Sequence, residues 1–324
     1  MRKLILIILS LAAFNSYAWQ PTKVVEVVVP FPVGSGNDLV IRPLLDIVEK
    51  NTGVKFVVNN RPGAGGTIGT AYFSKLPNDG HHINVISVGG VAAMDYTWPG
   101  MFKNAAYGVN SFAYATALAR TPIVIIANKK DTVDNSKDLI DIIIKDPKVV
   151  VADSGGAGRL GLESVLINVD IRKKNPNLVR VEHKGPAETV VDIMGGNVRF
   201  GSVPLVVAYP HYAAGNLKIV ALTQQKKIEG LAISSFGDIN KNIDVELVWG
   251  IALPKDTASE VVEWYARVFT EAKNDLKIKE YFKKNYFFDV PKELEDPKSF
   301  NKYVLDQEKL QKPIVKYIVE TTPN

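Results

Sequence analysis

Residues 24–38 read VVEVVVPFPVGSGND, a run of β-branched side chains followed by a glycine-rich turn. The same order recurs further along, where residues 56–69 read FVVNNRPGAGGTIG. A strand, a glycine turn and the first turn of a helix leave several backbone N–H groups without partners, and the helix dipole favours negative charge at that end. Both segments therefore predict loops that can bind an anion.

The rest of the chain continues this alternation of short β-branched runs with longer amphipathic stretches. Such alternation is typical of βαβ units and predicts an α/β fold built on a parallel sheet. The predicted strands are 24–29, 56–59, 83–87, 123–128, 149–152, 198–200, 218–222 and 247–253.

Helices are expected between these strands and in the last quarter of the chain. The first is predicted over 38–50 with Pro43 inside it, where a proline removes one backbone hydrogen bond. Thr257 and Glu260 form a capping-box pattern ahead of another apolar helical series. A last helix is expected to begin near Ser299.

The N-terminus has the pattern of a secretion signal. Arg2 and Lys3 form a basic start, and the apolar run 4–14 is far shorter than the roughly 20 residues that span a bilayer. Ser16 and Ala18 place small residues at the two positions that a signal peptidase reads. We therefore expect cleavage after Ala18 and a processed chain in the periplasm.

The composition excludes several kinds of site. The chain has no cysteine, which rules out disulfides, thiol catalysis, cysteine metal sites and a lipid-anchored cysteine. Its formal charge of +5 falls to +3 when Arg2 and Lys3 leave with the signal, and its lysines are scattered. This mild charge predicts no nucleic-acid partner. About 300 processed residues suffice for a core and favour two domains.

Motifs of the common enzyme classes are absent from the sequence. It contains no Walker-type G-x-x-x-x-G-K-[ST], no G-x-S-x-G elbow and no H-E-x-x-H, and neither early loop completes G-x-G-x-x-G. Of the histidines, only His81 and His82 are adjacent, and neighbours on a strand point to opposite faces. We therefore predict a protein that is not an enzyme and holds no metal or cofactor.

The first two loops supply the first candidate ligand-binding residues. Backbone amides and the Ser35 hydroxyl can meet a carboxylate, whereas Asp38, itself an anion, is expected to cap the helix or accept from loop amides. A plain strand–helix turn explains the first loop equally well, so both interpretations stay open. Arg61 is expected to brace its loop rather than bind the ligand. The candidates are Phe31, Gly34, Ser35, Gly36, Asn37 and Asp38, and then Gly63, Ala64, Gly65, Gly66 and Thr67.

Two later loops follow the same rule. One follows a predicted strand and precedes an apolar series, and its candidates are Ser154, Gly155, Gly156 and Ala157. The other is HKGP at 183–186, where an exposed lysine near a turn is common and does not by itself indicate a site. Trp249 sits in a strand-like run and is expected in the core.

Taken in order, the motifs resemble one known family. They are PFP at 30–32, RPGAGG with IG at 61–69, DG at 79–80, SGGAG at 154–158, KG at 184–185, DIMGGNV at 192–198, AG at 214–215, and WG at 249–250 with Pro254. This series resembles the periplasmic receptors of the tripartite tricarboxylate transporters, also called Bug receptors. The resemblance covers nearly the whole chain after residue 18, and the ordered series is specific although each motif alone is weak.

The resemblance implies a periplasmic binding protein-like fold with two α/β domains and a ligand cleft between them. It implies chain crossings near 121–122 and 222–223, so that domain 1 comprises 19–121 and 223–324 and domain 2 comprises 122–222. The first two loops would hold one carboxylate, while residues 154–157 and the segment after Val198 would approach from domain 2.

The ligand that the resemblance implies is a di- or tricarboxylate or a related organic acid, held by backbone amides, hydroxyls and ordered water. Hinge closure would then present the receptor, a monomer, to two integral membrane transporter subunits.

Three positions depart from the family pattern. Residues 33–35 read VGS where the family has PGG, His183 stands in place of a tyrosine, and Val203 stands in place of a frequent aspartate. Val203 removes an acceptor for a ligand amine or hydroxyl, so we hypothesise a ligand without an amino group at that point. A clear preference for aspartate or glutamate over every plain di- or tricarboxylate would contradict this hypothesis.

Two other functions stay open from the sequence. The protein could be a sensing receptor that docks on a signalling kinase. It could also be a secreted lyase or hydrolase using His183 and Lys184, which the absence of any nucleophile–base pattern disfavours.

Overall fold

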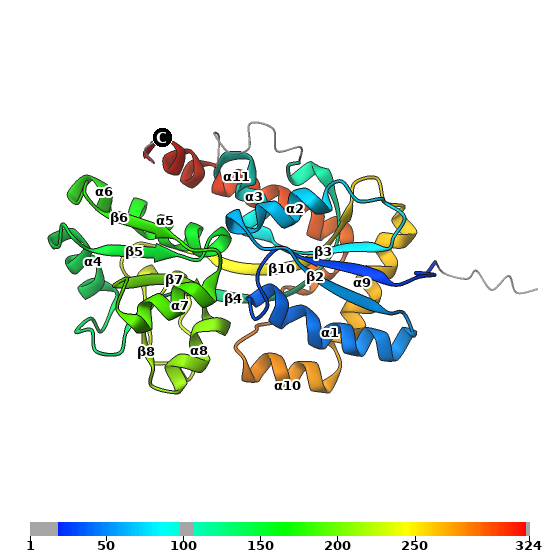
Figure 1. The fold of residues 1–324 in the computed structure, drawn as a ribbon, viewed down its shortest axis with the longest axis horizontal. Coiled ribbons are helices and arrows are strands. Elements are labelled where there is room, and N and C mark those ends of the chain that lie inside the picture. Colours follow the sequence, from blue (N-terminus) through cyan, green and yellow to red (C-terminus); the bar gives the residue numbers. More distant parts are fainter. Residues whose placement is uncertain (1–18, 98–106, 322–324) are drawn as a thin grey trace, which may run out of the picture.

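The computed structural model describes residues 19–97 and 107–321, in which strands and helices alternate (Figure 1). The predicted signal and its cleavage after Ala18 lie outside the described residues. The strands are β1 (Val25–Val29), β2 (Phe56–Asn60), β3 (His82–Ser87), β4 (Phe112–Asn128), β5 (Val150–Asp153), β6 (Val179–Glu182), β7 (Phe200–Pro204), β8 (Leu217–Leu222), β9 (Ser234–Ser235) and β10 (Glu246–Pro254). The helices are α1 (Gly36–Thr52), α2 (Thr67–Phe73), α3 (Val88–Thr97), α4 (Ser136–Lys145), α5 (Gly156–Asn168), α6 (Ile171–Lys174), α7 (Pro186–Gly195), α8 (Leu205–Ala213), α9 (Ser259–Lys273), α10 (Leu276–Lys284) and α11 (Pro297–Thr321).

The strands join in one mixed sheet, and the predicted α/β class is confirmed. The strand order is β2-β1-β3-β10-β4-β7-β5-β6, while β8 pairs with β4 and β9. Figure 1 shows two groups of elements side by side, with β4 and β10 between them. The first half, as we call it, comprises β1–β3, β10, α1–α3, α9–α11 and residues 112–122 of β4. The second half comprises β5–β9, α4–α8 and residues 123–128 of β4.

Strand β4 joins the two halves. Its residues 112–122 pair antiparallel with β10, and its residues 123–128 pair with β7 and β8. The sequence predicted only the second of these segments, because the first reads FAYATALARTP and alanine is depleted in strands. Nearly all of β4 is buried, so tertiary packing overrides this weak local preference.

The strand predicted at 198–200 is misplaced. Gly196 ends α7 in the left-handed conformation, with φ at 77°, and the chain rejoins the sheet only at Phe200. Gly201 lies inside β7, although glycine in a strand usually indicates a bulge or a close approach, and Pro204 ends the strand. The short strands β6 and β9 were not predicted at all.

Helix starts were predicted with mixed success. The first helix was predicted from residue 38 with Asp38 as a possible cap, but α1 begins two residues earlier, and Ser35 caps it by accepting from the Asp38 backbone N–H (3.4 Å). Pro43 lies inside that helix as expected. The capping box at Thr257 is wrong, because α9 begins at Ser259 and the Thr257 hydroxyl donates to the Pro254 carbonyl instead (2.6 Å). None of the helices in the described ranges is long and apolar enough to cross a bilayer.

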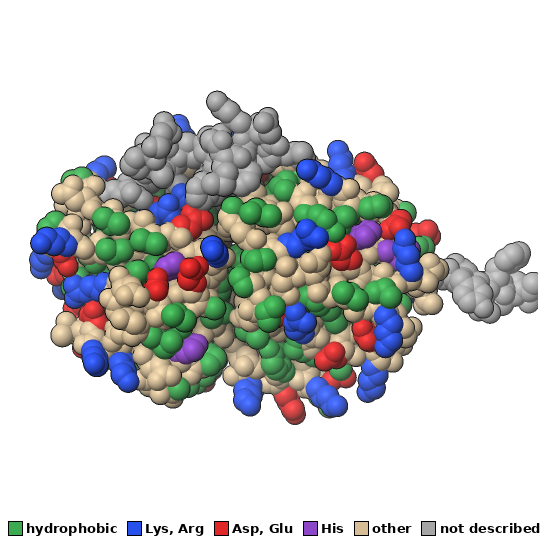
Figure 2. Space-filling view, viewed as in Figure 1, with side chains coloured by type: hydrophobic (Ala, Val, Ile, Leu, Met, Phe, Trp, Pro, Cys, Tyr) green, Lys and Arg blue, Asp and Glu red, His purple; other side chains and the backbone are tan. Residues whose placement is uncertain are grey.

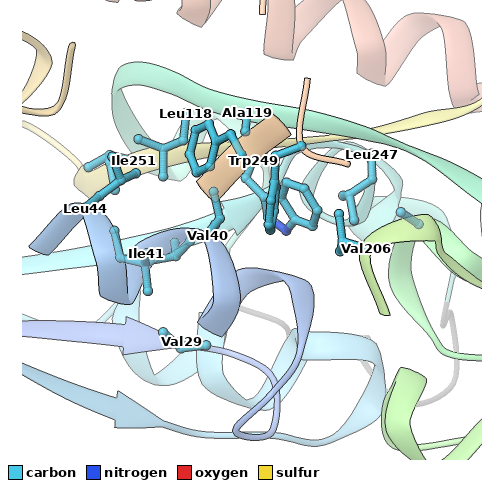
Figure 3. Packing of buried hydrophobic residues seen from close by; sticks show 14 of the residues in the cluster. Val29, Val40, Ile41, Leu44, Leu118, Ala119, Val206, Leu247, Trp249 and Ile251 are labelled. Atoms are coloured by element: carbon cyan, nitrogen blue, oxygen red, sulfur yellow. The ribbon is translucent and has the colours of Figure 1, made fainter. Parts of the chain in front are cut away.

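Trp249 of β10 is fully buried, as predicted for a core residue. Figure 3 shows it with Val40 of α1 on one side and Val206 of α8 on the other, so its ring packs against both halves. Its indole N–H donates to Asn37 Oδ1 (3.0 Å). This contact ties the start of α1 to the strand that runs between the halves.

Candidate functional site

The carboxyl ends of β1, β3, β5 and β7 meet at a small cavity between the two halves. In open α/β sheets this edge is where ligands bind. The cavity has a volume of about 20 Å³, room for roughly one water molecule. The residues that line it are Phe31, Ser35, Gly36, Asn37, Ser87, Ser154, Gly155, Ala157, Gly158, Pro186, Pro204 and Leu247.

Several helices begin at this cavity. Its wall contains the first residues of α1, α5 and α7 and the residues just before α3 and α8. Each helix N-terminus carries roughly half a positive charge and has N–H groups without helical acceptors. Within the described part of the chain, no Lys, Arg, His, Asp or Glu side chain lines the cavity. The wall can therefore stabilise an anion by backbone dipoles alone.

The first predicted loop forms one side of the cavity. Asn37 lines it, but its side chain is already used, because Nδ2 donates to the Val85 carbonyl (2.6 Å) and Oδ1 accepts from Trp249. Gly36 must lack a side chain, since a Cβ there would overlap the Trp249 ring. What this loop offers a ligand is therefore its backbone at the start of α1.

Asp38 braces the first loop instead of lining the cavity. Its carboxylate accepts from the Gly34 backbone N–H (3.0 Å), Arg42 Nε (2.8 Å) and Asn60 Nδ2 (3.1 Å). Burial acts to raise the pKa of Asp38, but these hydrogen bonds, led by that from Arg42, hold it below its usual range. The carboxylate thus stays charged and fixes the turn at Gly34, one of the roles expected from the sequence.

The second predicted loop does not reach the cavity wall. Its residues Gly63, Ala64, Gly65 and Gly66 have positive φ angles of 131°, 47°, 61° and 97°, and Thr67 begins α2. This turn brings Gly65 against the third loop, where a Cβ on Gly155 would lie 2.8 Å from the Gly65 Cα. The two glycine loops therefore touch each other across the two halves.

Arg61 braces the base of the second loop, as the sequence predicted. Its guanidinium lies 3.5 Å from the centroid of the Tyr72 ring. The Tyr72 hydroxyl in turn donates to Glu26 Oε1 (3.1 Å). This contact with α2 holds the chain where it leaves β2.

The third predicted loop forms the opposite wall, where Ser154, Gly155 and Ala157 line the cavity and Gly156 contacts the second loop. The Gly155 backbone N–H donates to Asp153 Oδ1 (2.9 Å), and Asp153 is fully buried.

A buried group of charges lies behind this loop. Arg180 contacts Asp153 (2.5 Å), Glu163 (3.4 Å) and Glu182 (3.7 Å), while Arg159 contacts Glu182 (3.4 Å). Burial and then the neighbouring Asp153 raise the pKa of Glu182. These ion pairs fix the path of the loop without presenting a charge to the cavity.

Two predicted site residues lie away from the cavity. His183 is buried against α7, with Nδ1 3.0 Å from Thr189 Oγ1 and Nε2 2.8 Å from Asp192 Oδ2. Val203 is fully buried in β7 opposite Val124. Neither side chain lines the cavity, so the structure does not bring these two departures from the family pattern to it.

The sequence missed several lining residues, among them Ser87, Pro186, Pro204 and Leu247. Ser87 could have been found, because it ends the predicted strand 83–87 and therefore belongs at the same sheet edge as the first loop. The others come from segments whose meeting at one place depends on how the two halves are arranged.

A wider groove of about 710 Å³ runs beside α11. Its lining comes from the middle of α5 and α11 and from residues 224–229 and 242–246, not from helix starts. Two of the cations there are paired, Arg120 with Glu246 (2.8 Å) and Lys227 with Asp238 (3.0 Å), and the carboxylates of Glu229 and Asp244 also line the groove. The small cavity is therefore the better candidate for an anion.

The described residues show neither a metal site nor, on the visible face, a surface of one charge. Within 19–97 and 107–321, no group of three or more His, Asp or Glu side chains is placed to hold a metal ion. Figure 2 shows Lys and Arg interspersed with Asp and Glu over both halves of the visible face, without a stripe of one sign.

The chain is similar in sequence to one known family and to several of its members. A family model described as the tripartite tricarboxylate transporter family receptor matches residues 40–319. Protein BugT of Bordetella pertussis is 24% identical over 267 residues, which are 81% of this chain and 80% of that protein.

Solved structures of similar fold include BugD and MatC. BugD, described as a periplasmic binding protein, has a TM-score of 0.80 at 25% identity, covering 91% of this chain and 98% of BugD. MatC from Rhodopseudomonas palustris, solved with bound malate, has a TM-score of 0.83 at 18% identity, covering 91% of this chain and 100% of MatC. At that identity the likeness to MatC concerns the fold.

Proposed function

The chain belongs to the tripartite tricarboxylate transporter receptor family, and on that premise we propose that it captures a small carboxylate in the cavity between its two halves. The observation that carries this proposal is a wall of helix starts to which the described residues contribute no charged side chain. Such a wall neutralises a carboxylate by N–H dipoles. MatC binds malate, and we extend that class here to a di- or tricarboxylate or a related organic acid.

Capture would proceed by hinge closure. Glycine loops in contact across the halves describe a closed arrangement, and β4 and β10 run between the halves as hinge strands. The cavity of this arrangement holds about one water molecule, so the halves would stand further apart around a bound acid than they do here. Ligand would stabilise a closed form of this kind by its higher affinity for it than for the open form.

We propose two domains that correspond to the two halves. The first crossing would lie near residues 121–122, where β4 changes partners from β10 to β7 and β8. Since β9 pairs with β8, and Phe236 and Ile243 belong to the core of the second half, we place the return crossing at Val245–Glu246, beyond residues 222–223.

After capture, the ligand would be delivered to a membrane transporter. We propose that the signal directs the chain to the periplasm, where the closed receptor, a monomer, passes its ligand unchanged to two integral membrane transporter subunits. The family consists of binding receptors, which supports a role without catalysis.

Thermal unfolding against a panel of small carboxylates tests this function. The processed protein is unfolded and refolded to strip any ligand, then scanned with mono-, di- and tricarboxylates. A ligand at about 100 times its Kd adds roughly 2.7 kcal/mol to the free energy of unfolding and raises Tm. A rise with one or more acids, each recovered chemically unchanged, is the expected result. No rise with any acid would remove carboxylate capture as the function, and turnover of a bound acid would favour an enzyme.

A further inference from the structure

Ser87 lies at the cavity in a position that the predicted loops do not cover. It is the last residue of β3 and immediately precedes α3. Its side chain is 5% exposed and lines the cavity from the first half. A Cβ on Gly90 would lie 3.5 Å from the Ser87 hydroxyl and 3.9 Å from the Cα of Gly156, so Ser87 stands where α3 faces the loop of the second half.

The Ser87 hydroxyl is buried and has no hydrogen-bond partner in the described structure. A buried hydroxyl without a partner costs free energy, which a ligand acceptor would recover. By contrast, the Asn37 side chain uses both its ends within the protein, and Ser35 accepts from the Asp38 backbone. Ser87 is therefore a free donor on the wall of the first half.

A second serine lines the cavity from the other half. Ser154 follows β5, lines the cavity and precedes the start of α5 by two residues. The two helices pack together, since Cβ atoms on Gly89 and Gly90 would contact Leu160 and Ala157 and approach Gly156. The N-termini of α3 and α5, each with the positive end of its helix dipole, thus lie close together. A serine precedes each of them, and both are distinct from the start of α1.

We propose that Ser87 is a specificity-determining residue, which donates to the second carboxylate of the ligand and, with Ser154, holds that group between the two halves. This inference rests on the proposed function, in which the start of α1 takes the first carboxylate. Removing the hydroxyl leaves the first carboxylate held as before. Ser87 would therefore discriminate between acids with one carboxylate and acids with more.

The test combines variants with ligands that differ in the second carboxylate. Ser87→Ala, Ser87→Thr and the control Ser74→Ala are compared with the wild type by calorimetric titration with succinate, malate, citrate and butyrate. Ser74 lies at the end of α2, outside the cavity wall, and its hydroxyl donates to Ala71.

Ser87→Ala is expected to weaken the tightest-binding di- or tricarboxylate by about 10- to 100-fold, the range for a hydrogen bond to a charged group, while changing butyrate by less than about 3-fold. Ser87→Thr keeps the donor and should retain most of the affinity. Tm of ligand-free Ser87→Ala should equal or exceed that of the wild type, because an unpaired buried hydroxyl has been removed. A serine that acts only in folding would instead lower Tm and affect all ligands alike.

Three outcomes would overturn the inference. They are unchanged affinity of Ser87→Ala for every acid, equal losses for succinate and butyrate, and a wild type that binds butyrate but no acid with a second carboxylate. In each of them carboxylate capture still stands. A wild type that binds none of the four acids, with a flat thermal panel, would end the proposed function and this inference with it.

Discussion

At Gly155 the absence of a side chain allows two loops from opposite halves to touch. Its φ is 70°, and a Cβ there would lie 2.8 Å from the Gly65 Cα. Gly155→Ala should therefore both strain the backbone and hold the halves apart. With ψ at 175° this backbone conformation is essentially restricted to glycine, so we expect a loss of about 1–3 kcal/mol in the free energy of unfolding, together with a clear loss of carboxylate affinity. Denaturant unfolding and calorimetric titration measure the two effects separately.

Gly196 provides the matched control. Its φ is 77°, and a Cβ there meets nothing within 4 Å. Its ψ of 12° places it in the ordinary left-handed region, so Gly196→Ala should lose about 1–2 kcal/mol in the free energy of unfolding but keep the affinity of the wild type. If both variants bind the ligand equally well, the contact between the loops is not needed for capture.

The sequence predicted which residues lie near the cavity more clearly than it predicted the role of each side chain. It placed residues 34–38 at a helix start, and Asp38 has one of the roles expected for it. It could not show that Asn37 is already occupied, because its partners Val85 and Trp249 are 48 and 212 residues away along the chain. It also left out Ser87, whose hydroxyl stands out only once its burial without a partner is known.

At the scale of elements, β6 joins β5 and α5 through Arg180, the central cation of the buried charges behind the third loop. Arg180→Met would leave the buried carboxylates of Asp153 and Glu163 and the partly buried one of Glu182 with Arg159 as their neighbouring cation. We expect a loss of about 3–5 kcal/mol in the free energy of unfolding at pH 7, the range for a broken buried ion pair. Urea unfolding measures it.

This loss should shrink as the pH falls. Burial and Asp153 already raise the pKa of Glu182, and removing Arg180 raises it further. A carboxyl whose pKa is higher in the folded state destabilises the fold while charged and stops doing so once protonated, so stability returns as the pH falls toward the ordinary Glu value of 4.5. Arg267→Met removes an exposed pair with Glu271 and should cost less than about 0.5 kcal/mol at pH 7 and pH 5. Equal losses for the two variants would contradict the expectation.

Element by element, the sequence succeeded where local pattern and burial agree. Strands β1 to β3 were predicted from β-branched runs, and helix α1 was predicted from an amphipathic stretch, although its cap proved to be Ser35. The first part of β4 was missed because an alanine-rich segment becomes a strand only when β10 and buried neighbours surround it. The Thr257 cap failed because its hydroxyl has a competing acceptor, the Pro254 carbonyl.

For the whole molecule, the closing motion can be tested directly by cross-linking. The chain has no cysteine, so two introduced cysteines would be its only thiols. A Cβ on Gly185 would lie 3.2 Å from Cδ of Pro32, so these positions face each other across the halves. The pair Pro32→Cys and Gly185→Cys, bridged by a short thiol-reactive cross-linker, should lock the closed form. Bridged without ligand it should take up no acid, and bridged with ligand it should retain the acid through dialysis.

The single-cysteine variants, treated identically, should bind and release ligand like the wild type. Uptake by the empty bridged protein at the rate of the unbridged one would contradict a closing motion at this contact. The sequence could not identify this contact, or that of Gly65 with Gly155, because both depend on the rotation of one half relative to the other.

A binding wall made of main-chain N–H groups also shapes how the receptor changes over generations. A substitution exchanges a side chain and leaves the N–H group in place, so we expect most single substitutions in these loops to preserve binding of the anion. The substitutions that we expect to weaken binding most are those of glycines such as Gly155 and of hydroxyl-bearing residues such as Ser87. Side chains such as Phe31 and Leu247 can then vary and alter the preferred acid. The preferred ligand can then change without an intermediate variant that binds nothing.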